Sequence, residues 1–227
     1  MKTTYIHHSC FLVETDYCYY LFDYEKGSLP QLNTEKPIYV LASHGHYDHY
    51  NPQIVTILEE LGLKKIQGIL SDDIEVPENK NVLQVSAGNE YYLGEHQQLT
   101  TFQSTDLGVA FLIEDHGKLI YHAGDLNDWV WEEESESYNE QMTMDYRNQI
   151  DSLFEKLNHR EIDVAFVVLD PRQEKDYDRG MKYFLEHIPV KQVYPMHYWD
   201  KPDIIENFLD DYPKYKNTVQ CTEKRKI

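Results

Sequence analysis

Four side chains that can bind a divalent metal ion lie within six residues: His44, His46, Asp48 and His49. His44 and His46 are two positions apart, so an extended chain points both imidazoles the same way. Asp48 and His49 come later, where a loop can turn them towards a second centre. Imidazole and carboxylate ligands suit zinc, manganese or iron, and hydrolysis needs one open position for water. This spacing favours a metal-dependent hydrolase over a surface loop that is rich in histidine by chance.

The flanking sequence predicts that these ligands lie between a strand and a helix. Residues 38–42 form a short apolar run typical of a buried strand. Asn51 and Pro52 are a helix-start signal, with Asn as the N-cap and Pro in the first turn. The helix is expected over residues 53–61, with an apolar face that includes Leu61, and Gly62 ends it. Loops at the ends of buried strands are common places for catalytic residues.

The remaining pattern predicts an α/β protein in which strand-rich halves are each followed by helices. Such halves imply two packed sheets covered by helices, although their strand order stays open. No linker rich in Pro, Gly or Ser and no repeat interrupts the chain, so a single domain over residues 1–227 is expected. An acidic loop is expected over residues 131–140. Further strands are expected at 3–7, 10–15, 17–23, 66–70, 81–85, 97–103, 108–114, 117–122, 163–169 and 192–194, and helices at 145–157, 178–187 and 201–212.

Composition narrows the class of partner. The formal net charge is −19, from 21 basic and 40 acidic residues, which disfavours nucleic acid and leaves a small-molecule substrate. A hydrophobic fraction of 41% is enough for a folded core, and no run of about 18 apolar residues predicts a membrane span. Three cysteines without paired spacing and a start without a secretory leader predict a cytoplasmic protein. A homo-oligomer stays open.

The motif H-x-H-x-D-H after a short apolar strand resembles the metallo-β-lactamase superfamily. Three further segments carry the resemblance over most of the chain. Residues 8–14, HSCFLVE, look like the opening hairpin of its lactonase-like branch. Residues 121–125, YHAGD, resemble the strand end whose Asp bridges two metals, and residues 195–199, PMHYW, resemble the strand end that supplies the last His. The sequence is most similar to small cytoplasmic members that include ascorbate-6-phosphate lactonase.

The resemblance implies an αββα four-layer sandwich with metals between the edges of two sheets. It also implies that two cations activate a bridging water, and that a metal-bound hydroxide attacks a small-molecule ester or lactone, with Asp48 holding the nucleophile or moving its proton. One or two zinc, manganese or iron ions per chain are expected. The implied ligands are His44 and His46 for the first metal, Asp48, His49 and His197 for the second, and Asp125 as the bridge.

Three other functions stay open at this point. A small phosphodiester is the second choice of substrate, because the fold does not choose between electrophiles. A non-catalytic metal-binding protein that kept the fold is another alternative. A redox member of the superfamily is the weakest, since it usually needs a flavin partner domain that this chain lacks.

The chain departs from the family at the first metal. Members usually carry a third histidine before a Gly-aromatic strand, whereas residues 103–111 read QSTDLGVAF. Asp106 is the best replacement ligand by chemistry, and Ser104 is nearer the expected register; a structural Asx- or ST-turn is the alternative for this segment. The first site is therefore expected to be weaker or to select a harder metal than zinc. His96 and His116 are expected on the surface.

Residues near the predicted ligands could contact substrate. Arg172 follows the strand at 163–169 and could bind a phosphate or carboxylate with two hydrogen bonds, or pair structurally with a carboxylate. Tyr198 and Trp199 flank His197 and could line the same pocket. His8 could orient a ligand from behind, or be an ordinary strand histidine.

Aromatic residues in and beside the acidic stretch allow two interpretations. Trp129, Trp131 and Tyr138 could form a lid over the metals and contact substrate. Core packing or an oligomer contact is the alternative. His122 is expected to have a structural role.

Overall fold

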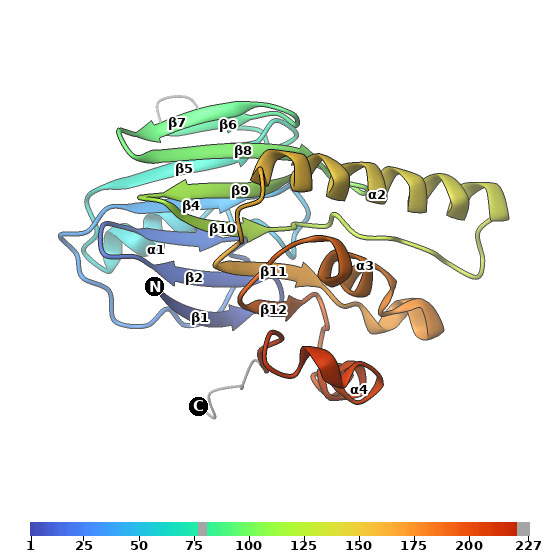
Figure 1. The fold of residues 1–227 in the computed structure, drawn as a ribbon. Coiled ribbons are helices and arrows are strands. Elements are labelled where there is room, and N and C mark those ends of the chain that lie inside the picture. Colours follow the sequence, from blue (N-terminus) through green and yellow to red (C-terminus); the bar gives the residue numbers. More distant parts are fainter. Residues whose placement is uncertain (77–80, 222–227) are drawn as a thin grey trace. The chain divides into compact units, whose positions relative to one another are not determined.

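Two compact units divide the computed structural model, which describes residues 1–76 and 81–221. The N-terminal unit runs to Ser86, and the C-terminal unit begins at Ala87. Each contains one six-stranded sheet (Figure 1). The single domain expected over residues 1–227 stays a prediction.

The sheet of the N-terminal unit follows the order of the sequence, β1-β2-β3-β4-β5-β6. The first three strands pair antiparallel, and β3 to β6 pair parallel. Every residue of β3 and β4 is buried. The strands are β1 Lys2–His7, β2 Cys10–Glu14, β3 Tyr19–Phe22, β4 Ile38–Ala42, β5 Ile66–Ser71 and β6 Val82–Val85.

Helix α1, Ile54–Glu60, connects β4 to β5 and buries Ile54 and Leu58 against the apolar residues of β3 and β4. The predicted helix is confirmed, but Asn51 does not cap it. The Asn51 side chain accepts a hydrogen bond from the Gln53 backbone at 2.9 Å, which caps the turn before the helix. Leu61 is 51% exposed because the helix has already ended, so its expected place on the apolar face was wrong.

The sheet of the C-terminal unit has the order β12-β11-β10-β9-β8-β7. Strands β7 to β10 pair antiparallel, and β10, β11 and β12 pair parallel. A tight turn joins β9 to β10, with His116 and Gly117 both at positive φ, 49° and 80°. The strands are β7 Glu90–Gly94, β8 Gln97–Gln103, β9 Val109–Asp115, β10 Lys118–His122, β11 Val164–Val168 and β12 Val193–Met196.

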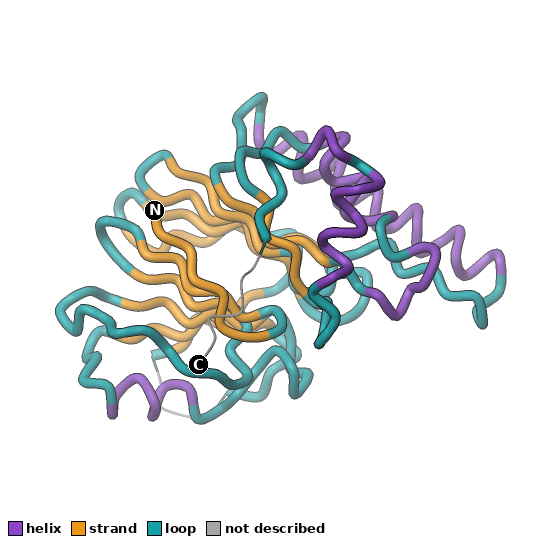
Figure 2. Tube along the Cα trace, turned by 90° about the horizontal axis from the view of Figure 1, so that it is seen from below, coloured by secondary structure: helices purple, strands orange, loops and turns teal. Residues whose placement is uncertain are grey.

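Helices of the C-terminal unit follow β10, β11 and β12. Helix α2 contacts β8 and α3, and α3 contacts β11; Figure 2 distinguishes helices from strands by colour. In the described part of the chain, no helix is both long and apolar enough to cross a membrane. The helices are α2 Glu136–Leu157, α3 Arg179–His187 and α4 Asp203–Asp211, with short 3-10 turns η1 Pro171–Asp176 and η2 Pro213–Tyr215.

The structure of this unit differs from the sequence-based expectations in two places. The second half of the expected acidic loop is helical, because the Ser135 hydroxyl accepts a hydrogen bond from the Tyr138 backbone at 3.2 Å and starts α2 there. A first-turn Glu136 adds a favourable charge at the same end. Strand β7 was not expected, because it is an edge strand with exposed and half-buried residues in alternation and no apolar run.

Candidate metal centre

The histidine-rich loop lies between β4 and α1, as the sequence predicted. Backbone amides of His49 and Tyr50 both donate to the His46 carbonyl, at 3.0 and 3.1 Å, and turn the loop back on itself. His44 and His49 are fully buried, whereas His46 is exposed and Asp48 is half-buried. The loop therefore has buried ligand candidates at its base and an open side where a small molecule can approach.

Asp23 orients two of these histidines. No motif or spacing in the sequence indicated this role. It directly follows β3, and the Phe22–Leu41 pairing with β4 brings it beside Ser43. One Asp23 oxygen accepts from the Ser43 hydroxyl at 2.7 Å and contacts His49 Nδ1 at 2.8 Å. Since the Ser43 hydroxyl proton goes to Asp23, its oxygen accepts from His44 Nδ1, 3.0 Å away. Both rings thus have Nδ1 protonated, which leaves Nε2 of each as the metal-binding atom.

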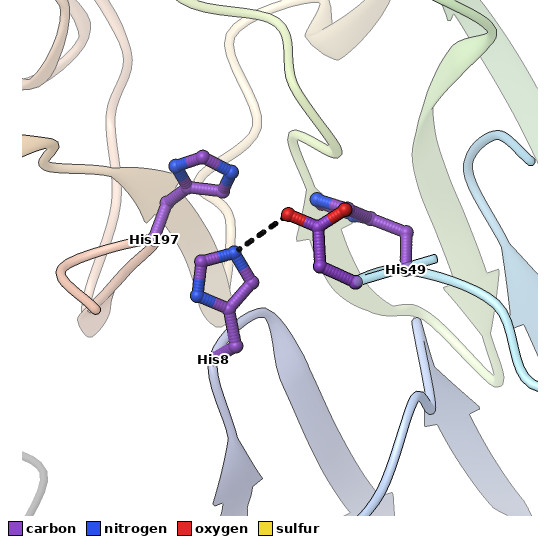
Figure 3. A group of neighbouring side chains, drawn as sticks. His8, His49 and His197 are labelled. Atoms are coloured by element: carbon purple, nitrogen blue, oxygen red, sulfur yellow. Dashed lines mark ion pairs between the residues drawn. The ribbon is translucent and has the colours of Figure 1, made fainter. Parts of the chain in front are cut away.

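The N-terminal unit therefore contains two sets of candidate ligand atoms. His44 Nε2 and His46 Nδ1 lie 2.9 Å apart, so both nitrogens face one point. The second set comprises His8, Asp48 and His49, whose ligand atoms lie within 4.8 Å of one another. Figure 3 shows the His8 imidazole beside His49, with a dashed line for its 3.6 Å ion pair to Asp48. The sequence left open whether His8 orients a ligand from behind or is an ordinary strand histidine; in the structure its Nε2 faces the Asp48 carboxylate.

The C-terminal unit contributes residues from three neighbouring strand ends. Asp125 follows β10, Asp170 follows β11 and His197 follows β12. These strands are parallel neighbours, so their carboxyl ends lie along one edge of the sheet, where α/β proteins commonly bind ligands. His197 Nε2 lies 3.5 Å from an Asp125 oxygen. The two predicted ligands of this unit therefore lie together.

Asp170 orients the His197 ring, as Asp23 orients the His49 ring. Its Oδ2 lies 2.8 Å from His197 Nδ1, and both side chains are buried. Burial alone would raise the pKa of Asp170, but hydrogen bonds from His197 and Arg172 outweigh it and lower that pKa to about 2. The carboxylate is therefore ionised at neutral pH and accepts the Nδ1 proton, so His197 Nε2 is its metal-binding atom.

The carboxylates of Asp106 and Asp125 lie close together, whereas the Ser104 side chain forms part of a turn. Carboxylate oxygens of Asp106 and Asp125 lie within 4.8 Å of one another. The Thr105 hydroxyl fixes this arrangement, because it donates to the Asn127 carbonyl at 2.6 Å and accepts from the Asn127 amide at 2.9 Å. The Ser104 hydroxyl accepts from the Asp106 amide at 3.1 Å, which is the ST-turn that the sequence left open.

Arg172 is both paired and partly accessible. Its Nε and Nη2 donate to Asp170, and its guanidinium lies 4.7 Å from the Trp199 ring centroid and 5.9 Å from that of Trp131. The structural pairing considered from the sequence is therefore present. Its side chain is still 48% exposed, so a substrate group could reach it.

The other aromatic candidates divide by burial. Trp129 is buried, donates Nε1 to the Asp125 carbonyl at 2.8 Å and packs edge-on to His197, which places it in support of two ligands. Tyr198 is also buried, at 1% exposure. Tyr138 lies in the first turn of α2 and is 42% exposed. Direct contact of Trp129 or Tyr198 with substrate stays a prediction.

Three other histidines considered in the sequence, His96, His116 and His122, are not among these candidate ligands. His96 is exposed, and His116, at a hairpin turn, pairs with Asp115 at 2.7 Å with 30% of its side chain exposed. Buried His122 accepts a hydrogen bond from the Gly124 amide at 3.1 Å, which shapes the turn before Asp125. Surface positions for the first two and a structural role for His122 were expected.

The family model described as "Beta-lactamase superfamily domain" matches residues 2–142, more than half of the chain. The chain belongs to this family. No curated protein matches it. Among solved structures, it is similar to Igni18, a metallo hydrolase from Ignicoccus hospitalis KIN4/I, with a TM-score of 0.66 and 18% identity over 97% of this chain and 94% of that one.

Two further solved structures in this set differ in their metals. The diiron β-hydroxylase CmlA from Streptomyces venezuelae gives a TM-score of 0.60 at 12% identity, over 96% of this chain and 52% of that one. Zn²⁺-bound PqqB from Methylobacterium extorquens gives 0.53 at 13% identity, over 93% and 82%. The predicted α/β class and metallo-β-lactamase fold are confirmed, with two mixed sheets and a few helices.

The donor set fits divalent cations. Imidazole nitrogens and carboxylate oxygens are the ligand types of zinc, manganese and iron sites. Hydrogen bonds from the far side of a metal-bound imidazole to a carboxylate are a regular feature of such sites, and His49 and His197 both have one. Family, fold and donor chemistry together support a metal-dependent hydrolase.

Proposed function

We propose that the protein hydrolyses a small-molecule ester or lactone with the help of bound divalent cations, as the lactonase-like branch of its superfamily does. The observation that carries the proposal is the repeated buried Asp–His pair. Asp23 fixes His49 in one unit, and Asp170 fixes His197 in the other. Folding stability alone does not call for two buried pairs that each leave an imidazole Nε2 as a ligand.

The ligands that the family resemblance implies would hold two ions. His44 and His46, with Asp106 in place of a third histidine, would hold the first ion. Asp48, His49 and His197 would hold the second, and Asp125 would bridge the two. Since its proposed ligands are two imidazoles and two carboxylates, the first site should favour a harder metal than zinc, such as manganese or iron.

The residues of this chain would position a water molecule and the substrate. Bound cations supply a water of lowered pKa and polarise the carbonyl oxygen that is attacked. Asp48 is half-buried beside the exposed His46, so its carboxylate can orient that water and accept its proton. Arg172 would hold an anionic group of the substrate, because its planar guanidinium is partly exposed and lies near the rings of Trp199 and Trp131.

A small phosphodiester is the alternative substrate. Arg172 could hold either kind of anion, because a carboxylate and a phosphodiester each carry one negative charge, and its own charge is already paired with that of Asp170. A non-catalytic metal-binding protein is the alternative from another class. The exposed His46 and half-buried Asp48 speak against it, since they leave the ligands open to a substrate.

An assay on matched panels tests the proposal. Protein loaded with Zn²⁺, Mn²⁺ or Fe²⁺ is assayed on lactones, carboxylic esters and phosphodiesters, with His46→Ala beside the unchanged chain. We expect turnover of a lactone or ester that His46→Ala abolishes. Turnover of phosphodiesters alone would select the alternative substrate. No turnover by any loaded form, together with unchanged metal affinity in His46→Ala, would refute the enzyme. Size-exclusion chromatography tests the open question of a homo-oligomer, and cell fractionation tests the expected cytoplasmic location.

A further inference from the structure

His8 lies in a setting that a hairpin turn does not usually provide. It follows β1 and precedes β2, in the two-residue turn between them. Residues at such tips are normally exposed, yet His8 is 3% exposed. Its backbone has a positive φ of 48°, a conformation for which Gly and Asn are the usual residues. The turn therefore buries an imidazole at a position that is normally exposed.

The His8 ring is directed at the second set of ligand atoms. Its Nε2 lies 3.6 Å from Asp48 Oδ2, and its ligand atom lies within 4.8 Å of that of His49 (Figure 3). A separation of 3.6 Å is longer than a hydrogen bond between nitrogen and oxygen. Two ligand atoms that share a tetrahedral zinc ion, each about 2.1 Å from it, lie about 3.4 Å apart. The observed spacing thus suits two ligands of one cation better than a direct hydrogen bond.

We propose that His8 is a direct ligand of the cation bound by Asp48 and His49. The inference rests on the proposed metal centre and adds a ligand to it. The N-terminal unit alone would then give this cation two imidazoles and a carboxylate. The second site would hold zinc firmly, while the first site, richer in carboxylates, would hold a harder metal. The two sites would therefore differ in metal preference within one chain.

Asn is the most informative replacement for His8. It tolerates a positive φ, so His8→Asn keeps the turn and removes the imidazole. His116→Asn is a matched control, because His116 also lies in a hairpin turn at a φ of 49° and also pairs with an Asp. Asp23→Asn gives the effect of losing a partner that only orients a ligand, which is typically about 10–100-fold in metal affinity.

The experiment is a competition titration of the metal-free chain with Zn²⁺ against a coloured chelator, followed by the visible spectrum of the Co²⁺-loaded protein. We expect His8→Asn to weaken one Zn²⁺ site by more than about 100-fold, beyond the range of an orienting partner, and to change the Co²⁺ bands. His116→Asn should match the unchanged chain. Circular dichroism of each metal-free variant checks that it folds.

Other outcomes would argue against a direct bond between His8 and the cation. A loss within the range of Asp23→Asn and an unchanged Co²⁺ spectrum would make His8 a positioning residue. Zn²⁺ affinity equal to that of the unchanged chain would refute any role. If the unchanged chain binds no Zn²⁺ or Co²⁺, the proposed function itself fails. Crystals of the zinc-loaded unchanged chain give a test without a variant: an anomalous peak should lie within about 2.3 Å of His8 Nε2, and a peak beyond bonding distance overturns the proposal.

Discussion

Asp170→Asn is the sharpest test of the polar network in the C-terminal unit. The pKa of Asp170 falls from 3.8 to about 2, a difference of about 1.8 units. At 1.36 kcal/mol per unit, the folded state favours the ionised carboxylate by roughly 2 kcal/mol relative to the unfolded chain. Asn resembles the neutral acid, so it should lower the free energy of unfolding of the metal-free protein by about that amount at pH 7. For a chain of this length, the midpoint of thermal unfolding should fall by about 5–9 °C.

The pH dependence separates this charge effect from a general packing defect. A depressed pKa gives stability that is present above the unfolded pKa and is lost as pH falls through the folded one. In urea unfolding, the free energy of unfolding of Asp170→Asn should therefore differ from that of the unchanged chain by the full amount at pH 7, by roughly half of it at pH 3 and by little at pH 2. A difference that stays constant from pH 7 to pH 2 would refute the reasoning. Asp115→Asn is the control for metal binding, since Asp115 pairs with His116 away from the ligands: only Asp170→Asn should lower Zn²⁺ affinity, by about 10–100-fold.

Two further predictions concern neighbouring residues. Thr105→Val removes two hydrogen bonds to Asn127 and should cost about 1–3 kcal/mol in urea unfolding. It should also weaken Mn²⁺ binding, whereas Thr143→Val, which breaks a bond to Asp128, should leave Mn²⁺ binding unchanged. Arg172→Lys keeps the charge but loses the planar pair of donors. Steady-state kinetics should show KM raised about 10-fold for an anionic substrate and little changed for a neutral one; equal effects on both would remove Arg172 from substrate binding.

The sequence predicted those parts of the centre that lie close together in the chain or that follow the order of the family's motifs. The loop from His44 to His49 was found because its ligands are contiguous and follow a buried strand. Asp125 and His197 came from family motifs at strand ends. Most strands were also placed correctly, because buried apolar runs such as β4 and β11 have a strong pattern.

The parts that the sequence missed depend on which strands are neighbours. Asp23 reaches Ser43 only because β3 pairs with β4, and Asp170 reaches His197 only because β11 pairs with β12. No local pattern contains either pairing. His8 was underestimated for a similar reason, since a residue in a hairpin turn is normally taken to be exposed. Edge strand β7 lacks the apolar run that marks a strand, and Ser135 starts α2 within a stretch whose charges suggested a loop.

Metal stoichiometry tests whether the proposed ligands bind a pair of cations. The metal-free chain is titrated with Zn²⁺ and with Mn²⁺, and bound metal per chain is measured by elemental analysis. We expect two ions per chain. One of the sites is tight for Zn²⁺ and is lost in His49→Ala and equally in His197→Ala; the other is weaker and is lost in His46→Ala. Binding of one ion or none, or loss of affinity in His49→Ala without loss in His197→Ala, would contradict this expectation.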